Sequence, residues 1–410
     1  GLFQTIDPNT YYTLYGDASL QQHDAASAKK LYIRIEREQF YALFGDYDTD
    51  LTVTELTRYS RRMTGFKTET QTRNVEIKAF ASQTDQVYQR DEIPGNGTSG
   101  MYRLSRRNIL PNTEKITVEA RNRFQSQILV SSRAMSRFTD YSIDYDAGVM
   151  IFKEPIYSRD ENLNPITIVA EYETIAENGE DLTYGGRVGV KLWDNRLKAG
   201  GSYIHEGEGE RVGNLYGVDT TVRLDQSTTL RAELATSDFA DGTQSRDGNA
   251  YLAEISRNGK KIDAKAYYRE QESGFGLGQQ PGCEAGTRKV GFEGAYYLKD
   301  GMDSTGNLYR LYNLETDATR DVAEGRLNYA NNRCNAYVGV LHAQDDLDDG
   351  NAYESNQIIM GAKVPTLHDR LSLSLDYAQS VGENENSDYP TRVVVSAEYK
   401  ATRILTLLAA

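Results

Sequence analysis

The chain has 410 residues, with 60 acidic against 46 basic side chains, a formal net charge of -14 and a mean hydropathy of -0.63. This acidic balance argues against nucleic acid as a partner, because phosphate binding needs a basic face. Two cysteines are too few for a secreted domain framed by disulfides. No stretch approaches about eighteen consecutive apolar residues, so the sequence predicts no transmembrane helix.

Short alternating segments occupy the first part of the chain. Apolar and polar side chains take turns, which is the period of a strand with one apolar face. The apolar members of these segments include Leu31, Ile33, Ile35, Val75, Ile77 and Ala79. We expect residues 1–82 to form the N-terminal strands of a barrel.

The alternation breaks over residues 83–165. A turn-rich stretch, 91–100, is followed by short segments at 115–121, 128–132, 141–145 and 149–152. A membrane-spanning strand needs about nine to eleven residues, so these segments are too short to span. They predict a small inserted β-domain and a candidate plug.

Arginines gather in and around this insertion. We expect them to hold it against an acid-rich lumen wall through charge-assisted hydrogen bonds, although scattered surface arginines are an equally open interpretation. The residues are Arg103, Arg106, Arg107, Arg121 and Arg123.

Residues 166–410 carry the strongest alternation, and their connections switch between tight and long. The tight ones are Asp194-Asn195, Asp225-Gln226, Asn258-Gly259, Asp300-Gly301 and Asn331-Asn332. The long ones are 205–212, 237–248, 271–287, 344–351 and 380–389. Asn-Gly and Asp-Gly favour two-residue hairpin turns. Short turns at one end and long loops at the other are typical of outer-membrane barrels, whose short turns are periplasmic.

These patterns predict an all-β fold: a transmembrane, antiparallel, up-and-down β-barrel of roughly 18 to 20 strands with an inserted small β-domain. The expected parts are 1–82, 83–165 and 166–410. If the tight turns are periplasmic, the strand expected at 166–174 runs outward. Parity then places the root of the insertion at the periplasmic end, unless the insertion hides an odd number of spanning strands. A domain rooted there could plug the lumen; an ordinary extracellular domain is the alternative.

Two stretches resemble segments of known proteins. They are Leu43-Phe44-Gly45-Asp46 with 51–56, and 141–152 followed by Pro155-Ile156. Both resemble barrel regions of large Gram-negative outer-membrane proteins that carry repeated immunoglobulin-like or adhesin-like domains. A more distant likeness is to the barrel translocon of type IX secretion. The resemblance implies a barrel with an internal or periplasmic β-domain and larger domains outside this chain, and it supplies no catalytic residue.

Candidate metal sites are weak. Asp46, Asp48 and Asp50 have calcium-loop spacing, but Leu51 and Thr57 stand where the glycine and the bidentate glutamate belong, which favours a solvated loop. An acidic loop could hold a divalent cation, although a charged surface loop is the default interpretation. Its residues are Asp345, Asp346, Asp348 and Asp349.

No other site is expected. His205 and His342 fall near strand ends without a catalytic spacing signature, so we predict no enzyme, no catalytic residue and no cofactor. Cys283 and Cys334 are expected at opposite ends of the strands, about 30 Å apart, and therefore unpaired. Gly1 is not preceded by a visible signal peptide, so the sequence leaves open whether a leader was removed or the chain is a fragment.

The expected location is the bacterial outer membrane, with membrane lipid and lipopolysaccharide as partners and other protein subunits or surface domains as candidates. Two functions follow. One is a transport or secretion conduit, because barrels of about 16 to 18 strands leave an aqueous channel unless filled. The acidic excess would favour cations. The other is a non-conducting anchor that displays surface domains or binds a partner protein.

Overall fold

The structure is a computed structural model that describes residues 33–84, 86–122, 128–160, 164–175, 181–208, 211–240, 244–280, 284–331, 333–348, 350–366, 370–382, 389–400 and 406–409. The elements formed by these residues are β-strands, and the pairings between them are antiparallel. The predicted all-β, antiparallel class is therefore confirmed. Within the described ranges no helix is long and apolar enough to cross a membrane.

One large sheet dominates the molecule. It contains 18 strands in the described part of the chain, within the predicted range. They run as an antiparallel meander in which β4 pairs with β12. The strands are β1 (Ile33–Arg37), β2 (Phe40–Asp48), β3 (Arg62–Gln71), β4 (Val75–Thr84), β12 (Asp181–Leu192), β13 (Leu197–Glu208), β14 (Arg211–Arg223), β15 (Thr228–Ala240), β16 (Ser245–Asn258), β17 (Ile262–Gln271), β18 (Thr287–Lys299), β19 (Met302–Asn313), β20 (Thr319–Asn331), β21 (Cys334–Asp346), β22 (Ala352–Thr366), β23 (Leu371–Ser380), β24 (Arg392–Lys400) and β25 (Thr406–Ala409).

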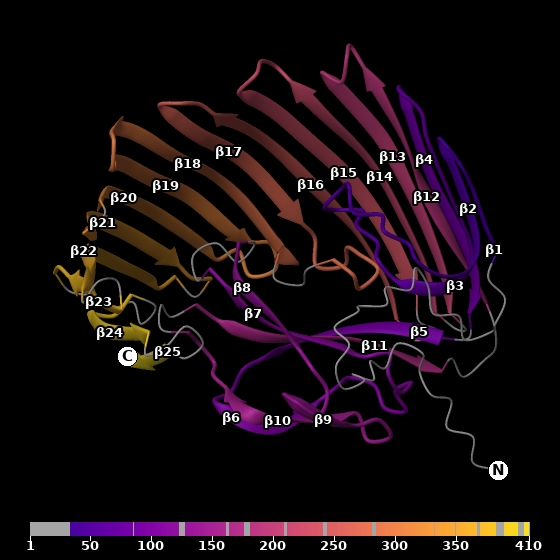
Figure 1. The fold of residues 1–410 in the computed structure, drawn as a ribbon, viewed down its shortest axis with the longest axis horizontal. Coiled ribbons are helices and arrows are strands. Elements are labelled where there is room, and N and C mark those ends of the chain that lie inside the picture. The colour runs from indigo at the N-terminus through magenta and orange to yellow at the C-terminus, as the bar shows by residue number, and fades with distance from the viewer. Residues whose placement is uncertain are drawn as a thin grey trace.

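The sheet curls around an inner space, which gives it a concave and a convex face (Figure 1). Among the described residues, β1 pairs with β2 alone and β25 with β24 alone. The closure of a complete barrel is thus not seen in this part of the chain.

The segment between β4 and β12 forms two smaller sheets. The three-stranded sheet has β6 (Thr98–Arg103), β9 (Tyr141–Asp144) and β10 (Val149–Ile156), and the four-stranded sheet has β5 (Gln86–Pro94), β7 (Lys115–Arg121), β8 (Leu129–Met135) and β11 (Ile166–Ile175). A hydrophobic cluster of their own joins them; it includes Ile116, Tyr141, Met150, Phe152 and Ile168. We call residues 86–175 the inserted segment.

The predicted boundary at residue 165 is ten residues early. β11, which the sequence assigned to the barrel, pairs with β5 and β7 and not with the large sheet. Its alternation shows only that one face is buried, and that face is buried in the inserted segment.

This reassignment also changes the side on which the insertion is rooted. Thr84 at the end of β4 and Asp181 at the start of β12 are register partners. The inserted segment therefore leaves the large sheet at the end that carries the long connections, opposite the tight turns (Figure 1). The predicted root at the short-turn end is wrong, because it counted β11 as a spanning strand.

Several turn predictions are confirmed. Asp194 and Asn195 lie between β12 and β13 with φ of 52° and 66°, and Gly301 has φ of 73° between β18 and β19. Two predicted long loops are wrong, since β13 reaches Glu208 and β15 reaches Ala240. The polar side chains of these stretches lie on strands that extend beyond their apolar, outward-facing part. Asn214 on β14, for example, donates a hydrogen bond to Asp238 on the neighbouring β15.

The convex face exposes apolar side chains over most of the sheet. Val218, Val340 and Val395 are 57%, 62% and 61% exposed. Neighbouring strands continue the band through register pairs such as Val218 with Leu234, Phe292 with Leu308, and Leu375 with Val395. Charged pairs lie on the concave face instead. The sheet therefore has apolar side chains outside and charged ones inside, the reverse of a sheet in a water-soluble protein.

Candidate functional site

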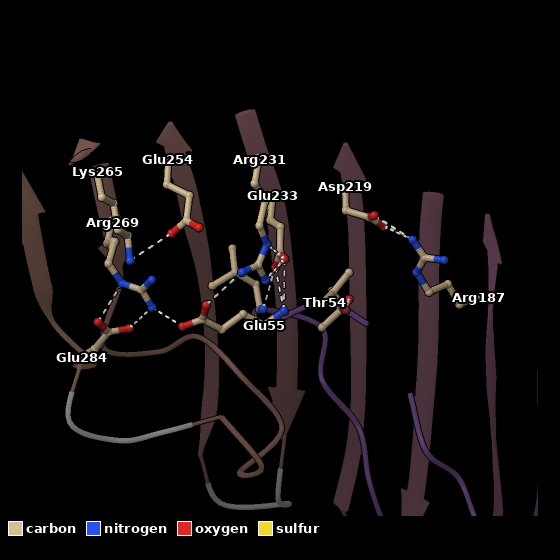
Figure 2. A network of polar contacts seen from close by, with 12 residues as sticks. Thr54, Glu55, Arg187, Asp219, Arg231, Glu233, Glu254, Lys265, Arg269 and Glu284 are labelled. Atoms are coloured by element: carbon tan, nitrogen blue, oxygen red, sulfur yellow. Dashed lines mark hydrogen bonds and ion pairs between the residues drawn. The ribbon is translucent and has the colours of Figure 1, made fainter. Parts of the chain in front are cut away.

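A loop on the concave face begins where β2 ends. The N–H of Thr49 bonds to the carbonyl of Arg61 at 2.9 Å, and Leu51 and Tyr59 exchange two backbone hydrogen bonds. These contacts shape residues 49–61 into a narrow hairpin-like turn, which we call the inward loop. Its tip lies against the inner wall at β15 (Figure 2).

The inward loop is attached to the wall by apolar contacts. Tyr59 is fully buried, and its ring stacks on Phe80 at 5.5 Å between centroids. Residues 272–280, which follow β17, join the same cluster. Its members include Leu51, Leu56, Tyr59, Ile204, Leu215, Leu252, Phe275 and Leu277. Full burial of one such side chain contributes about 1.5–3 kcal/mol, so the cluster holds the loop firmly in place.

Glu233 on β15 anchors the tip of the loop. Its side chain is 3% exposed, and its carboxylate accepts hydrogen bonds from the backbone N–H of Glu55, at 2.9 and 3.1 Å, and of Leu56, at 2.9 Å. Arg231 on the same strand donates to the same carboxylate at 3.0 Å (Figure 2). The carboxylate thus accepts from two backbone N–H groups at the loop tip, where no strand pairing satisfies these two groups.

The side chain of Glu55 joins a second set of charges. Arg269 on β17 donates to Glu55 and, at 2.9 Å through both Nε and Nη2, to Glu284. Arg231 Nη1 lies 3.6 Å from Glu55 Oε2. Burial raises the Glu55 pKa, but the hydrogen bond from Arg269 and the charges of both arginines outweigh burial and lower the pKa from its ordinary value. Glu55 is therefore held as a carboxylate.

The base of the loop is held by Glu206 on β13. Its carboxylate accepts the Tyr59 hydroxyl at 2.6 Å and Arg61 Nη1 at 3.3 Å. Two glutamines from the connection after β17 bond to the loop backbone. Gln279 Oε1 accepts from the Ser60 N–H at 2.8 Å, and Gln280 donates to the carbonyl of Leu56 at 3.4 Å.

Arg61 connects the loop to the inserted segment. Its Nη2 lies 3.7 Å from Glu173 on β11, and its guanidinium carbon lies 5.1 Å from the ring centre of Tyr88 on β5. Burial, with the nearby charge of Glu171, raises the Tyr88 pKa and keeps its hydroxyl protonated. The Arg61 side chain is only 1% exposed, and a cavity of about 470 Å³ lies beside it between the two parts.

Further charge pairs lie on the inner wall. Arg187 on β12 donates to both oxygens of Asp219 on β14 at 2.6 and 2.8 Å, and Lys265 lies 3.3 Å from Glu254 (Figure 2). Paired charges thus lie on the concave face beyond the inward loop as well.

The predicted metal candidates do not converge. Asp345 lies on β21, and both of its oxygens accept from Arg320 at 2.6 Å. Asp346 accepts from Gln344, Asp348 lies in the following turn, and Asp349 falls outside the described residues. In the described ranges no group of three or more histidine, cysteine, aspartate or glutamate side chains is placed to hold a metal ion.

The arginines expected at the lumen wall are placed differently. Arg103, Arg106 and Arg107 are exposed, Arg121 pairs at 2.6 Å with Glu119 on the same strand, and Arg123 falls outside the described residues. At the contact with Arg61 the charges are reversed, with the carboxylate on the inserted segment.

The remaining candidates are structural. Asp46 accepts a hydrogen bond from Thr64, while Asp50 adopts φ of 51° in the inward loop. The Nδ1 atoms of His205 and His342 each bond to an asparagine, at 2.8 and 2.9 Å. Cys334 begins β21 at the tight-turn end and forms no disulfide with any described residue. Cys283 lies outside them.

The sequence prediction missed the inward loop and its acceptors, Glu206 and Glu233. One signal was present. Pairs such as Tyr203-Ile204, Leu215-Tyr216 and Tyr251-Leu252 place apolar residues on both faces of the strand. An inward apolar residue in an otherwise polar lumen wall indicates that something packs against it.

Comparisons with known proteins add little. No family model and no curated protein matches the chain. Among solved structures, it is similar to the P pilus usher (PapC) translocation pore, with a TM-score of 0.40 and 13% identity over 90% of this chain and 79% of the other. It is also similar to an E. coli P pilus tip assembly intermediate, PapC-PapD-PapK-PapG, with a TM-score of 0.37 and 12% identity over 90% of this chain and 48% of that chain. Likenesses this weak establish neither a family nor a function.

Proposed function

We propose that the chain spans the bacterial outer membrane as a β-barrel. In this proposal its convex face contacts lipid and lipopolysaccharide. Its lumen is a transport or secretion conduit, obstructed by the inward loop and plugged by the inserted segment. The proposal assigns no catalytic residue and no cofactor.

The convex apolar band carries this proposal. An exposed apolar surface that continues across neighbouring strands is unstable in water, and a contiguous patch of this kind marks a contact with lipid or protein. The rings of Tyr184, Tyr203 and Tyr216 adjoin one another, with centroids 5.9 and 4.9 Å apart. They lie toward the long-connection end, as expected of an aromatic girdle at the headgroup level.

The number of strands supports a conduit. A closed barrel of about 16 to 18 strands encloses an aqueous channel unless protein fills it. Here the inward loop fills part of the concave side, and the inserted segment lies across its end (Figure 1). Since short turns face the periplasm in outer-membrane barrels, we place the inserted segment at the outer mouth.

Planar-bilayer conductance tests the conduit. Because Thr84 and Asp181 are register partners, residues 85–180 can be replaced by a two-residue Asn-Gly turn that continues the β4–β12 hairpin. The intact chain is expected to be silent or to conduct weakly, and the deletion variant to conduct strongly. Heat-dependent migration in detergent gels shows whether each variant is folded.

The second candidate is a non-conducting anchor that displays surface domains or binds a partner protein. The apolar cluster under the inward loop favours it, because this part of the lumen is packed like a protein core. A folded deletion variant that remains silent would refute the conduit and leave the anchor.

A further inference from the structure

A second hollow lies on the concave face, away from the inward loop. A cavity of about 530 Å³ separates the inserted segment from the wall formed by β19 to β24. Asn122 and Asn164 line it on one side, and four charged residues line the wall. Side chains of this wall, such as Arg326, are partly exposed, whereas Ile204 and Leu215 under the inward loop are fully buried. The open part of the lumen is therefore the part that faces β19 to β24.

The charges that line this cavity balance. Glu324 and Asp376 contribute two negative charges, and Arg326 and Arg392 two positive ones. Arg326 Nε donates to Glu324, and the Tyr337 hydroxyl donates to Asp376 at 2.7 Å. The Arg326 guanidinium also lies over the Tyr337 ring, 5.0 Å from its centre. Together the four groups carry no net charge, so an ion that passes them meets no excess of either sign.

Gly361 keeps the hollow open. An added Cβ there would lie 2.4 Å from Cε1 of Tyr337, so the tyrosine ring lies flat against the backbone of the neighbouring strand. Any larger residue at Gly361 would push this ring into the cavity. At Gly339 an added Cβ would first meet the backbone oxygen of Gly325, at 2.4 Å, so a larger residue there would shift the strands themselves.

One polar atom at the cavity lacks a protein partner. Oδ1 of Asn307 is buried and accepts no hydrogen bond from any described residue. Buried carbonyl oxygens of this kind are nearly always satisfied, here by a water molecule or by the hydroxyl or amine of a solute.

We propose that the wall of this cavity formed by β19 to β24 lines the conduit once the inserted segment is displaced, and that the conduit then passes small uncharged polar solutes with no strong preference for either sign of ion. The inference rests on the proposed conduit. It replaces the cation preference expected from the chain's net charge, because the lining of the open passage and not the total charge sets selectivity.

Reversal potentials in a potassium chloride gradient test the lining. The conducting deletion variant is expected to show a potassium-to-chloride permeability ratio near one. Adding Arg326→Gln and Arg392→Gln removes two positive charges and should raise the ratio at least about tenfold, because one unit charge about 6 Å away in water changes the local potassium concentration about threefold and the chloride concentration about threefold in the opposite direction. Glu324→Gln with Asp376→Asn should lower it by a similar factor. Lys265→Gln removes one charge from the wall beside the tip of the inward loop (Figure 2), away from this cavity, and should leave the ratio unchanged.

A steric test does not depend on charge. Gly361→Ala should push the Tyr337 ring into the passage and reduce both conductance and the uptake of a pentose into proteoliposomes. Gly325→Ala is the control, since no atom lies within 4 Å of its added Cβ. If the folded variants conduct, but neither the charge changes nor the glycine change alters permeability or conductance, this inference is wrong while the proposed conduit still stands. Silence from every folded form would refute the conduit itself.

Discussion

Glu233→Gln is the most informative single change to the inward loop. Gln has nearly the same shape as Glu, but it is neutral, and one of its two terminal groups donates instead of accepting. In the native protein Oε2 accepts from the N–H groups of both Glu55 and Leu56, while Oε1 accepts from Arg231. An amide can place its neutral oxygen against the two N–H groups only by turning its NH2 group toward Arg231, so both bonds to the loop lose their charged acceptor. The tip of the loop should therefore detach more often from β15.

The size of the effect follows from the number of bonds. A hydrogen bond to a charged group contributes about 1.5–3 kcal/mol, and a buried N–H left unsatisfied costs about 1–3 kcal/mol. Replacing the charged acceptor of two hydrogen bonds by a neutral one costs about 1–1.5 kcal/mol for each bond, which gives about 3 kcal/mol in the local opening equilibrium. Since about 1.4 kcal/mol is a factor of ten, transient opening should become on the order of 100-fold more frequent.

Amide hydrogen exchange in detergent micelles measures this opening directly. Peptides that cover residues 49–61 should lose about 100-fold in protection, while those from β15 stay protected, because its ladder bonds to β14 and β16 remain. Glu254→Gln is the matched control; its carboxylate pairs with Lys265 on the same wall. Unchanged protection of the loop in folded Glu233→Gln would refute the anchoring role of this carboxylate.

Three further predictions concern the same region. Because the arginine contacts lower the Glu55 pKa, the stability that this carboxylate contributes is complete above its ordinary pKa of 4.5 and is lost as the pH falls through the lower folded-state pKa. A carboxyl titration by NMR should therefore give a midpoint below 4.5. A midpoint at or above 4.5 would contradict the arginine contacts. Gly217→Val should expose the loop to proteolysis, since an added Cβ would lie 2.3 Å from Cγ2 of Thr57, whereas Gly201→Val, with no atom closer than 3.7 Å, should not; equal cleavage of both variants would exclude this packing. Arg61→Met leaves two largely buried carboxylates without this partner and should destabilise the fold by about 3–5 kcal/mol, seen as a lower temperature of the gel-migration shift; an unchanged temperature would mean that the ion pairs contribute little.

The strand pattern was predictable because its causes are local. Successive side chains of a strand point to opposite faces, so Val395 faces outward while Val394 and Ser396 face inward. This period of two is visible in the sequence. Tight turns were predictable for a similar reason. Asp194 and Asn195 tolerate positive φ, so they indicate where one strand ends and the next begins.

The assignment of β11 was not predictable from alternation. A strand with one apolar face carries no information about which sheet receives that face, and β11 packs Ile168, Ala170 and Tyr172 into the inserted segment. The error spread from this strand to the side of the insertion, since parity counts every strand. Long-range pairing decides both features, and a single sequence does not record it.

The inward loop was hidden for another reason. Residues such as Thr52, Thr54 and Glu55 have the polarity of an ordinary solvated loop, and their true environment depends on Glu233, which is 178 residues away from Glu55. Tertiary contacts of this kind override local composition. Only the doubly apolar positions of the facing strands gave any indication of the loop.

The two obstructions in the lumen differ in what it costs to move them. Lifting the inward loop exposes Leu51, Leu56 and Tyr59 to water, at about 1.5–3 kcal/mol for each side chain, and also breaks the bonds to Glu233 and Glu206. The inserted segment faces β19 to β24 across a cavity with a largely polar lining, which water can fill. Its displacement breaks the contacts of Arg61 with Glu173 and Tyr88, but it exposes little apolar surface at this cavity, and its own core stays intact. If the conduit opens, the inserted segment is therefore the part that moves, and the inward loop stays as a fixed lining that narrows the passage.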